Sequence, residues 1–311
     1  MISDLIMSTA PVGTTGGISP AGFRLKENRP VAEAVKKRVS FDRELHRYEA
    51  KYVIPNSLVP GIREYITPFC EPDPYGVGDP PSYVITTLQM DSPGLALHYA
   101  KLWDYVNRFK LRVRTYGDPV GKFPVFLEVK AKYRNSVVKL RSRIPFDKWG
   151  KHLFGDEIIR GIHFKTRKEE DNFYQFVRLT KEIGARPVML IRYNRESYFG
   201  KMESYARITL DRRLLYQQTY SWDSWGREGA WRNLDNPMIQ TRRHDKPLDF
   251  SGVVLEMKAL SDVPRWMINL TTEFDLVRVG HCKYSNAMWA ESMFRGTPWT
   301  PEYEIDLLQY L

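Results

Sequence analysis

Apolar and polar residues alternate along several short segments of this chain, most regularly near its middle. The segment FKLRVR, residues 109–114, has a basic side chain at every second position. Two later segments, LEVKAK (127–132) and VKLRSRI (138–144), repeat this design. Such alternation is typical of a β-strand whose two faces meet different surroundings. The pattern therefore predicts neighbouring strands that share one charged face.

Eight segments of this β-rich kind recur between turn-forming stretches and two longer insertions. So many short strands favour an antiparallel barrel or curved sheet, within an α+β fold whose helices pack outside. The predicted strands cover residues 47–54, 82–90, 109–115, 125–133, 136–144, 188–198, 206–210 and 253–260.

Other patterns predict helices and boundaries. A short helix is expected over 59–70, a longer one within KEEDNFYQFVRLTKEIG ending at Gly184, and a third within VPRWMINLTTEFDLVRV. Residues 217–250 are dense in Trp, Asn and Gly, which indicates an irregular loop or lid. We expect a flexible arm at 1–40, a folded domain at 41–290 and a tail at 291–311.

The composition indicates a globular protein that binds an anionic partner. Of its 311 residues, 42% are hydrophobic and 13% aromatic, enough for a large core, and its formal net charge is +10. Residues 108–143 hold eleven basic side chains against only Asp118 and Glu128, so most of the excess charge lies there. An anionic substrate or surface is the partner that this charge predicts.

The cysteine count and the hydropathy indicate the cellular compartment in which the protein is expected. Two cysteines, Cys70 and Cys282, provide neither a disulfide framework nor a cysteine zinc site, which favours a reducing compartment. The chain has no apolar run of membrane-spanning length, and its first residues do not resemble a signal peptide. We expect a cytoplasmic protein, which would associate with a membrane only through a partner protein.

Neighbouring strands with a shared basic face need something to offset the repulsion between like charges. The cations either spread over an open surface or line a wet barrel lumen that holds a polyanion. Three predicted strands also place a Glu two residues before a Lys, which predicts either cross-strand ion pairs or a divalent cation held beside phosphates. These pairs are Glu49 and Lys51, Glu128 and Lys130, and Glu256 and Lys258.

The order of several motifs between residues 47 and 284 resembles the VTC domain, the polyphosphate polymerase branch of the triphosphate tunnel metalloenzyme superfamily. The motifs are RYEAKY, KLRVRTYG, LEVKAKYRNSVVKLR, PVMLIRYNRESYF, ARITLDRRL, VLEMK and CKYSNAM. The resemblance implies an eight-stranded antiparallel tunnel with a nucleoside triphosphate and a divalent metal, Mn²⁺ or Mg²⁺, bound inside.

The resemblance also implies roles for single residues. Its basic, phosphate-binding positions correspond to Lys51, Arg112, Arg114, Lys130, Lys139, Arg195, Arg207 and Lys283. Tyr193 matches the tyrosine of a tyrosine–arginine element, and we expect Lys132, Arg141 and Lys258 to add substrate contacts. Glu256 corresponds to the metal-binding glutamate, and Glu128 and Glu49 are further candidates for that metal.

The chain departs from the family pattern where Cys282 stands in place of a serine before Lys283, which removes a strong hydrogen-bond donor. The six histidines show no metal-ligand spacing and are expected to be structural or on the surface. The aromatic run YSWDSWGREGAW is expected to pack a lid; stacking on an adenine is the alternative.

The resemblance implies an ATP-dependent polyphosphate polymerase whose partners are ATP and inorganic polyphosphate. A triphosphate or polyphosphate hydrolase could use the same residues with water as acceptor. A sensor of polyphosphate or inositol phosphates that performs no catalysis is another alternative, although it would have little need of Glu256. Nucleic acid is not expected, because such proteins usually add exposed aromatics or a recognition helix to their basic face.

Overall fold

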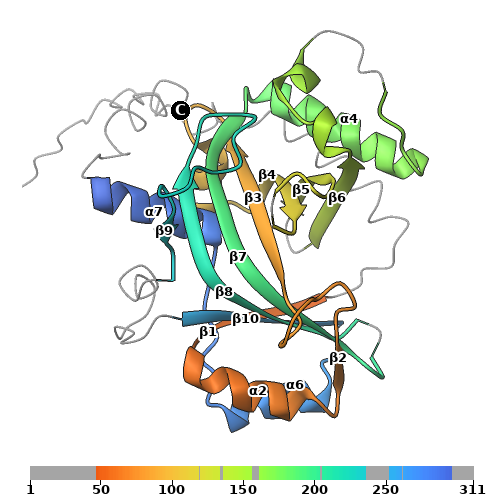
Figure 1. The fold of residues 1–311 in the computed structure, drawn as a ribbon, viewed down its shortest axis with the longest axis vertical. Helices are drawn as coiled ribbons and strands as arrows, with labels where there is room; N and C mark the ends of the chain where they lie inside the picture. Colours follow the sequence, from red (N-terminus) through yellow and green to blue (C-terminus); the bar gives the residue numbers. More distant parts are fainter. Residues whose placement is uncertain are drawn as a thin grey trace, which may run out of the picture.

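The computed structural model describes residues 47–118, 120–133, 136–155, 161–203, 205–235, 252–260 and 262–295. One large antiparallel sheet dominates this part of the chain (Figure 1). Its long strands are β1 (Arg47–Pro55), β3 (Tyr83–Asp91), β4 (Asn107–Tyr116), β5 (Val125–Tyr133), β6 (Ser136–Ile144), β7 (Arg186–Gly200), β8 (Arg207–Gln218) and β10 (Gly252–Leu260). Two short strands, β2 (Cys70–Pro72) and β9 (Arg232–Asn233), pair with β7 and β8.

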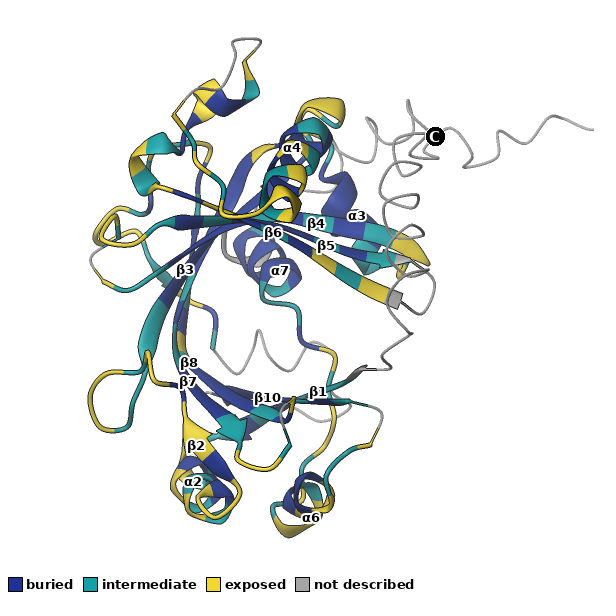
Figure 2. Cartoon of the chain, turned by 90° about the vertical axis from the view of Figure 1, so that its right-hand side faces the viewer, coloured by how far each residue is buried: buried dark blue, intermediate teal, exposed yellow. Residues whose placement is uncertain are grey.

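The strand order is β1-β10-β8-β7-β3-β4-β5-β6, and every pair is antiparallel. Figure 2 shows the sheet strongly curved, with β1 and β10 in one arm facing β4, β5 and β6 in the other. The predicted antiparallel, sheet-dominated α+β fold is therefore confirmed. The predicted closed barrel is not seen, because within the described residues the backbone pairing path ends at β1 and β6 without joining them.

Helices cover the outside of both arms. Helix α4 (Arg167–Glu182) packs on the β4–β6 arm, where Phe173, Phe176 and Leu179 enter one core cluster with the outward apolar residues of the strands. Helices α2 (Val59–Ile66) and α6 (Arg265–Glu273) pack beneath β1 and β10 in a second cluster. Because alternate strand residues are apolar and buried against helices, the polar residues between them must face the inside of the curve.

Helices α3 (Ala96–Leu102) and α7 (Lys283–Arg295) contribute to a third cluster with β3, β7 and β8. Figure 2 shows α7 between the two arms on the concave side of the sheet. Short 3₁₀ turns lie at Asn56–Leu58, Phe146–Lys148 and Lys151–Phe154. No helix of the described part is long and apolar enough to cross a membrane.

Residues 1–40, 236–251 and the end of the predicted tail lie outside the described residues. Helix α7 runs across residue 290, where the domain was expected to end. The aromatic run YSWDSWGREGAW lies within the described residues: Trp225 is buried, and Trp222 and Trp231 pack against the cluster under α4. This packing agrees with the expected structural use of these rings.

Candidate functional site

Strand register brings the predicted basic residues onto the concave face. Arg112 on β4 lies opposite Glu128 on β5, and Glu128 lies opposite Arg141 on β6. Lys130 and Lys139 are likewise opposite each other, one step along the same two strands. Since their apolar neighbours enter the core under α4, these polar side chains line the lumen of the curved sheet.

Glu128 is the centre of an ion-pair network in this arm. Its carboxylate oxygens lie 2.6 Å from Arg112 Nε, 2.6 Å from Lys139 Nζ and 3.4 Å from Arg141 Nε. Burial would raise the pKa of Glu128, but Arg112, Arg114 and Lys139 outweigh it and hold that pKa well below its usual range. Glu128 therefore stays ionised and holds the cations of the two neighbouring strands, β4 and β6, in place.

A second network lies in the opposite arm, on β1 and β10. Lys51 is opposite Glu256, and Glu49 is opposite Lys258. Glu49 lies 3.2 Å from Lys51, and Glu256 lies 3.0 Å from Lys258. Burial opposes the charged form of Lys51, but Glu256 and Glu49 raise its pKa above the ordinary value. This arm therefore presents both lysine and glutamate side chains to the lumen.

One contact joins the two arms across the lumen. Lys130 Nζ on β5 lies 3.6 Å from Glu49 Oε2 on β1. Burial lowers the pKa of Lys130 to about 8, and the charge of Glu49 only partly offsets this effect. The sheet is therefore bridged by side chains at a place where its backbone pairing is open.

The back of the lumen contains a carboxylate that the sequence analysis missed. Asp211 on β8 accepts hydrogen bonds from Arg195 at 2.6 and 2.8 Å and from Lys283 at 2.7 Å. Burial would raise the pKa of Asp211, but Arg195 and Lys283 lower it to about 2. The alternation in RITLD, which puts Arg207, Thr209 and Asp211 on one face, was the signal that could have found it.

Tyr193 completes this part of the wall. Its ring lies below both neighbouring cations, 4.7 Å from Lys283 Nζ and 5.4 Å from the Arg195 guanidinium carbon. Aromatic faces attract cations, so the ring helps to fix both side chains. The predicted tyrosine–arginine element is thus brought together with Lys283, although the three residues come from β7 and α7.

The remaining predicted residues lie toward the ends of the lumen. Arg207 donates to Ser197 Oγ at 3.0 and 2.9 Å, lies 3.6 Å from Asp73 and stacks over Phe199. Lys132 lies near the end of β5, opposite Arg108. The substrate-contact roles of Arg207 and Lys132 stay predictions.

Several lumen groups are buried without a hydrogen-bond partner within the described residues. They include Arg114 Nε, Thr87 Oγ1 and Thr209 Oγ1, on side chains that are 8%, 2% and 4% exposed. Buried polar atoms are almost always hydrogen-bonded, and leaving one unmade costs about 1–3 kcal/mol. A guanidinium and two hydroxyls aimed at the same lumen suit the oxygens of a bound anion.

The residues at the start of α7 tie this segment to four strands. Lys51 on β1 donates to the His281 carbonyl at 3.4 Å, and Lys110 on β4 donates to Cys282 Sγ at 2.9 Å. Lys283 reaches Asp211 on β8, and Tyr284 donates to Asp91 on β3 at 2.8 Å. The segment 281–284 therefore closes one part of the lumen.

The pKa values of two groups in these contacts, Cys282 and Asp91, are shifted. Burial would raise the pKa of the Cys282 thiol, but Lys110, followed by Ser285, lowers it to about 5. Burial raises the pKa of Asp91 to about 6, although three backbone N–H groups and Tyr284 favour its carboxylate. Lys110 is therefore the counter-charge of the Cys282 thiolate.

The carboxylates of the β1–β10 arm suit a hard divalent cation. Glu256 and Glu49 share one neighbour, Lys258, whose Nζ lies 3.0 Å from Glu256 Oε1 and 3.9 Å from Glu49 Oε2, so the two carboxylates lie close together in the lumen. No group of three or more His, Cys, Asp or Glu that could hold a metal occurs in the described ranges, so two carboxylates would be the protein's share. Mg²⁺ commonly takes one or two carboxylates and completes its shell with phosphates and water.

Glu128, the third predicted metal ligand, is surrounded by Arg112, Lys139 and Arg141. Its ion pairs account for both of its oxygens, so it fits a metal less well than Glu256 and Glu49 do. Metal binding by all three glutamates stays a prediction.

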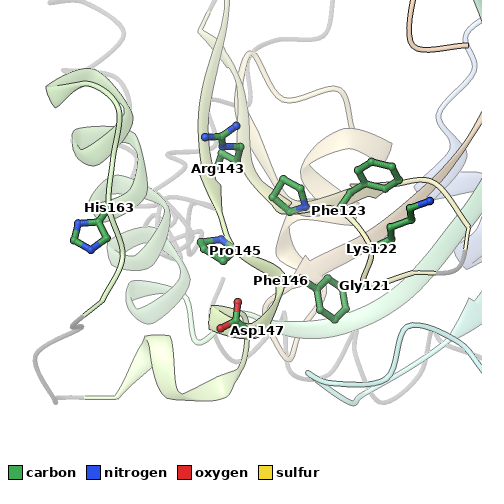
Figure 3. Close-up of a pocket in the computed structure, with 9 residues that line it drawn as sticks. Gly121, Lys122, Phe123, Arg143, Pro145, Phe146, Asp147 and His163 are labelled. Carbon is green, nitrogen blue, oxygen red and sulfur yellow. The ribbon is translucent and has the colours of Figure 1, made fainter.

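A pocket opens on the surface near the turn between β4 and β5 (Figure 3). It is lined by Gly121, Lys122, Phe123, Pro124, Arg143, Pro145, Phe146, Asp147 and His163. None of these residues was predicted to belong to a site.

Known proteins resemble this chain to different degrees. No curated protein matches the chain. A Hippeastrum protein, described as an adenylyl cyclase with a dominant triphosphatase activity, aligns over 78% of this chain and 95% of its own at 15% identity and a TM-score of 0.38. A Mimivirus capping enzyme triphosphatase aligns over 79% and 93% at 11% identity and a TM-score of 0.27. Both likenesses are distant. The model of the VTC domain matches residues 46–291, and the chain therefore belongs to the VTC domain family.

Proposed function

We propose that this protein is a polyphosphate polymerase that transfers the γ-phosphate of ATP to a growing polyphosphate chain and depends on Mn²⁺ or Mg²⁺. The observation that carries the proposal is the lumen itself. Its cations outnumber its carboxylates, and Arg114 Nε, Thr87 Oγ1 and Thr209 Oγ1 are buried with no hydrogen-bond partner among the described residues. The cations are Lys51, Lys110, Arg112, Arg114, Lys130, Lys139, Arg141, Arg195, Arg207, Lys258 and Lys283; the carboxylates are Glu49, Glu128, Asp211 and Glu256.

In this proposal the triphosphate of ATP lies along the basic rows. An oxygen of the acceptor phosphate forms a bond to the γ-phosphorus, the bond from that phosphorus to the β–γ bridging oxygen breaks, and ADP leaves with that oxygen. The acceptor oxygen is already ionised near neutral pH, so the reaction needs positioning and charge neutralisation more than a base. The triphosphate-binding residues are Arg112, Arg114, Lys130, Lys139, Arg195 and Arg207, and Tyr193 fixes Arg195.

Glu256 and Glu49 would hold the divalent cation, which would neutralise phosphate charge in the same lumen. Lys51 lies 3.2 Å from Glu49 and Lys258 lies 3.0 Å from Glu256, and these contacts orient both carboxylates. Burial would raise the pKa of Glu256, but Lys258 and Lys51 hold that pKa well below its usual range. Lys283 and Asp211 hold the start of α7 beside the same space.

A triphosphate hydrolase is the second candidate, and His281 favours it. Both ring nitrogens of His281 lack a hydrogen-bond partner within the described residues, and the side chain is buried. Burial, followed by the charges of Lys283 and Lys51, lowers the pKa of His281 well below its usual range, so the imidazole is neutral at pH 7. A neutral imidazole can accept a proton from water, which a phosphate acceptor does not require.

Product analysis separates the two reactions. The purified protein is incubated with ATP and Mn²⁺, and the products are resolved on a gel and by phosphate release. A ladder of long polyphosphate with matching ADP supports the polymerase. Free phosphate without polymer supports the hydrolase, and binding of ATP without any turnover would leave only the sensor.

A further inference from the structure

The pocket in Figure 3 lies outside the lumen, and its lining is built from three separate segments. The turn between β4 and β5 contributes Lys122 and Phe123, the end of β6 and the following turn contribute Arg143 and Phe146, and His163 lies on a third segment. The pocket therefore combines basic side chains with a preformed hollow.

The basic row of β6 runs from the lumen toward this pocket. On β6, Lys139, Arg141 and Arg143 share one face, and the next member of such a row is about 6.6 Å further along the strand. Arg141 stacks 3.8 Å above the Phe126 ring and donates to the Tyr116 hydroxyl at 3.1 Å, while Arg143 lies opposite Phe126. The basic row thus leaves the lumen at Arg141 and enters the pocket at Arg143.

The turn opposite β6 is fixed by close packing. Gly117 directly follows Tyr116 and has a φ of +82°, and a Cβ there would lie 2.4 Å from the Phe123 ring. Phe123 can therefore cover the turn only because residue 117 is glycine. This packing places the pocket wall beside the lumen residue Tyr116.

The charge of the pocket is positive and largely uncompensated. No ion pair involves Arg143 or Lys122 in the part of the chain that is described, and Arg143 is exposed. Glu169 accepts from the backbone N–H of Arg143 at 3.0 Å rather than from its guanidinium. Asp147, the acidic lining residue, lies 3.8 Å from Lys148. A ligand with several negative charges would complete this surface.

The aromatic rings favour phosphate over a nucleoside base. Phe123 packs against Gly117, and Phe146 packs 5.7 Å from Trp225 between ring centres. Phe146 is thus engaged in packing, and Phe123, which is 42% exposed, has Lys122 Nζ 5.8 Å from its ring centre. Arg143 has no ion pair among the described residues.

Resting on the proposed function, we infer that the pocket binds the part of a linear phosphate chain that extends beyond the lumen, with Arg143 and Lys122 as its phosphate contacts. The lumen alone then binds a triphosphate, and the lumen and pocket together bind longer chains. The lumen and pocket together would then distinguish phosphate chains by their length rather than by the chemical group at their end.

The test compares binding of tripolyphosphate with binding of a polyphosphate of about 60 units, using the full chain with Mg²⁺ and isothermal calorimetry. The double variant Arg143→Ala/Lys122→Ala is expected to bind the long chain about tenfold more weakly, since each lost contact is charge-assisted. Its affinity for tripolyphosphate is expected to stay within twofold of the unaltered protein.

The matched control is Arg265→Ala/Arg227→Ala, which removes the same charge from exposed positions on α6 and on the loop after β8. It is expected to bind both ligands like the unaltered protein.

Unchanged affinity of the pocket variant for the long chain would overturn the inference. An equal loss of long-chain affinity in both double variants would also overturn it, because the loss would then follow from net charge alone. Equal loss of both ligands in the pocket variant would assign these residues to the lumen and overturn it too. If the unaltered protein binds both ligands but forms no polymer, the polymerase proposal fails while the pocket is still tested.

Discussion

Lys130 on β5 and Glu49 on β1 form an ion pair, 3.6 Å between Nζ and Oε2, that joins two strands with no backbone hydrogen bond between them. Each side chain is about one-third exposed, at 36% and 33%. Such a pair contributes roughly 0–1 kcal/mol. The two arms are therefore held together weakly at this point and more firmly by the start of α7.

The Glu256→Gln variant is expected to lose metal-dependent turnover. The amide keeps the shape but removes the charge that a divalent cation needs, so we expect turnover to fall about 100-fold and the metal concentration for half-maximal activity to rise. Turnover of ATP across a Mn²⁺ titration measures both. Glu228→Gln, an exposed change outside the lumen, is the control and should behave like the unaltered protein. Full activity of Glu256→Gln would show that the metal assignment is wrong.

The Asp211→Asn variant is expected to lower both stability and activity. It leaves Arg195 and Lys283 without their buried counter-charge, which costs about 3 kcal/mol of the free energy of unfolding. Urea unfolding measures this loss. Combining Asp211→Asn with Lys283→Met should recover part of it, because the pair is then removed together. Strictly additive losses would contradict a direct coupling between these two residues.

Triphosphate affinity is expected to fall as pH rises through about 8. Burial lowers the pKa of Lys130 and of Lys139 to about 8 each, and the charges of Glu49 and Glu128 offset this only in part. Both lysines therefore lose their positive charge above that pH, and we expect binding to weaken about tenfold between pH 7 and 9. Calorimetry at fixed ionic strength measures the change.

The double variant Lys130→Arg/Lys139→Arg keeps both charges over this range, because arginine stays protonated. Its affinity should therefore vary much less with pH. An equally steep profile in this variant would assign the pH dependence to other groups.

Cys282 is expected to react rapidly with iodoacetamide at pH 6–7. Its thiolate is stabilised by Lys110, its pKa is about 5 and its side chain is partly accessible. Lys110→Met should slow the reaction at pH 6 about tenfold, because it removes the counter-charge. Mass spectrometry of the labelled chain measures the rate at each cysteine.

Cys70 is an internal control for this reaction. It is buried, and burial raises the pKa of its thiol to about 12, so it should stay unlabelled while the protein is folded. Equal labelling of both cysteines would contradict the assigned environments.

Much of the fold could be predicted because strand alternation is a local property. All eight predicted long strands exist, and 125–133 and 136–144 have the bounds of β5 and β6. The predicted strand 206–210 is shorter than β8, which extends to Gln218, since LLYQQ is not alternating and its pairing with β7 decides its structure. Helix α7 was missed because KYSNAMWAESMFR has only a weak amphipathic pattern, and its packing between the arms stabilises it.

The site was predictable where charge alternated along a strand. Arg112, Lys130 and Lys139 face the lumen as their rows indicated. The sequence of one strand does not show which residue lies across the lumen from it. The ion pair between Lys130 and Glu49 and the contact between Lys110 and Cys282 therefore appear only in the structure. Asp211 was missed because a single acid between arginines reads as an ordinary surface charge until Lys283 is placed beside it.

The position of segment 281–284 in the chain has a consequence for biosynthesis. All eight long strands precede these residues in the chain and are synthesised first, so Tyr284 reaches Asp91 and Lys283 reaches Asp211 only after every long strand has been made. The contacts that join this segment to β3 and β8 therefore become possible only late in synthesis.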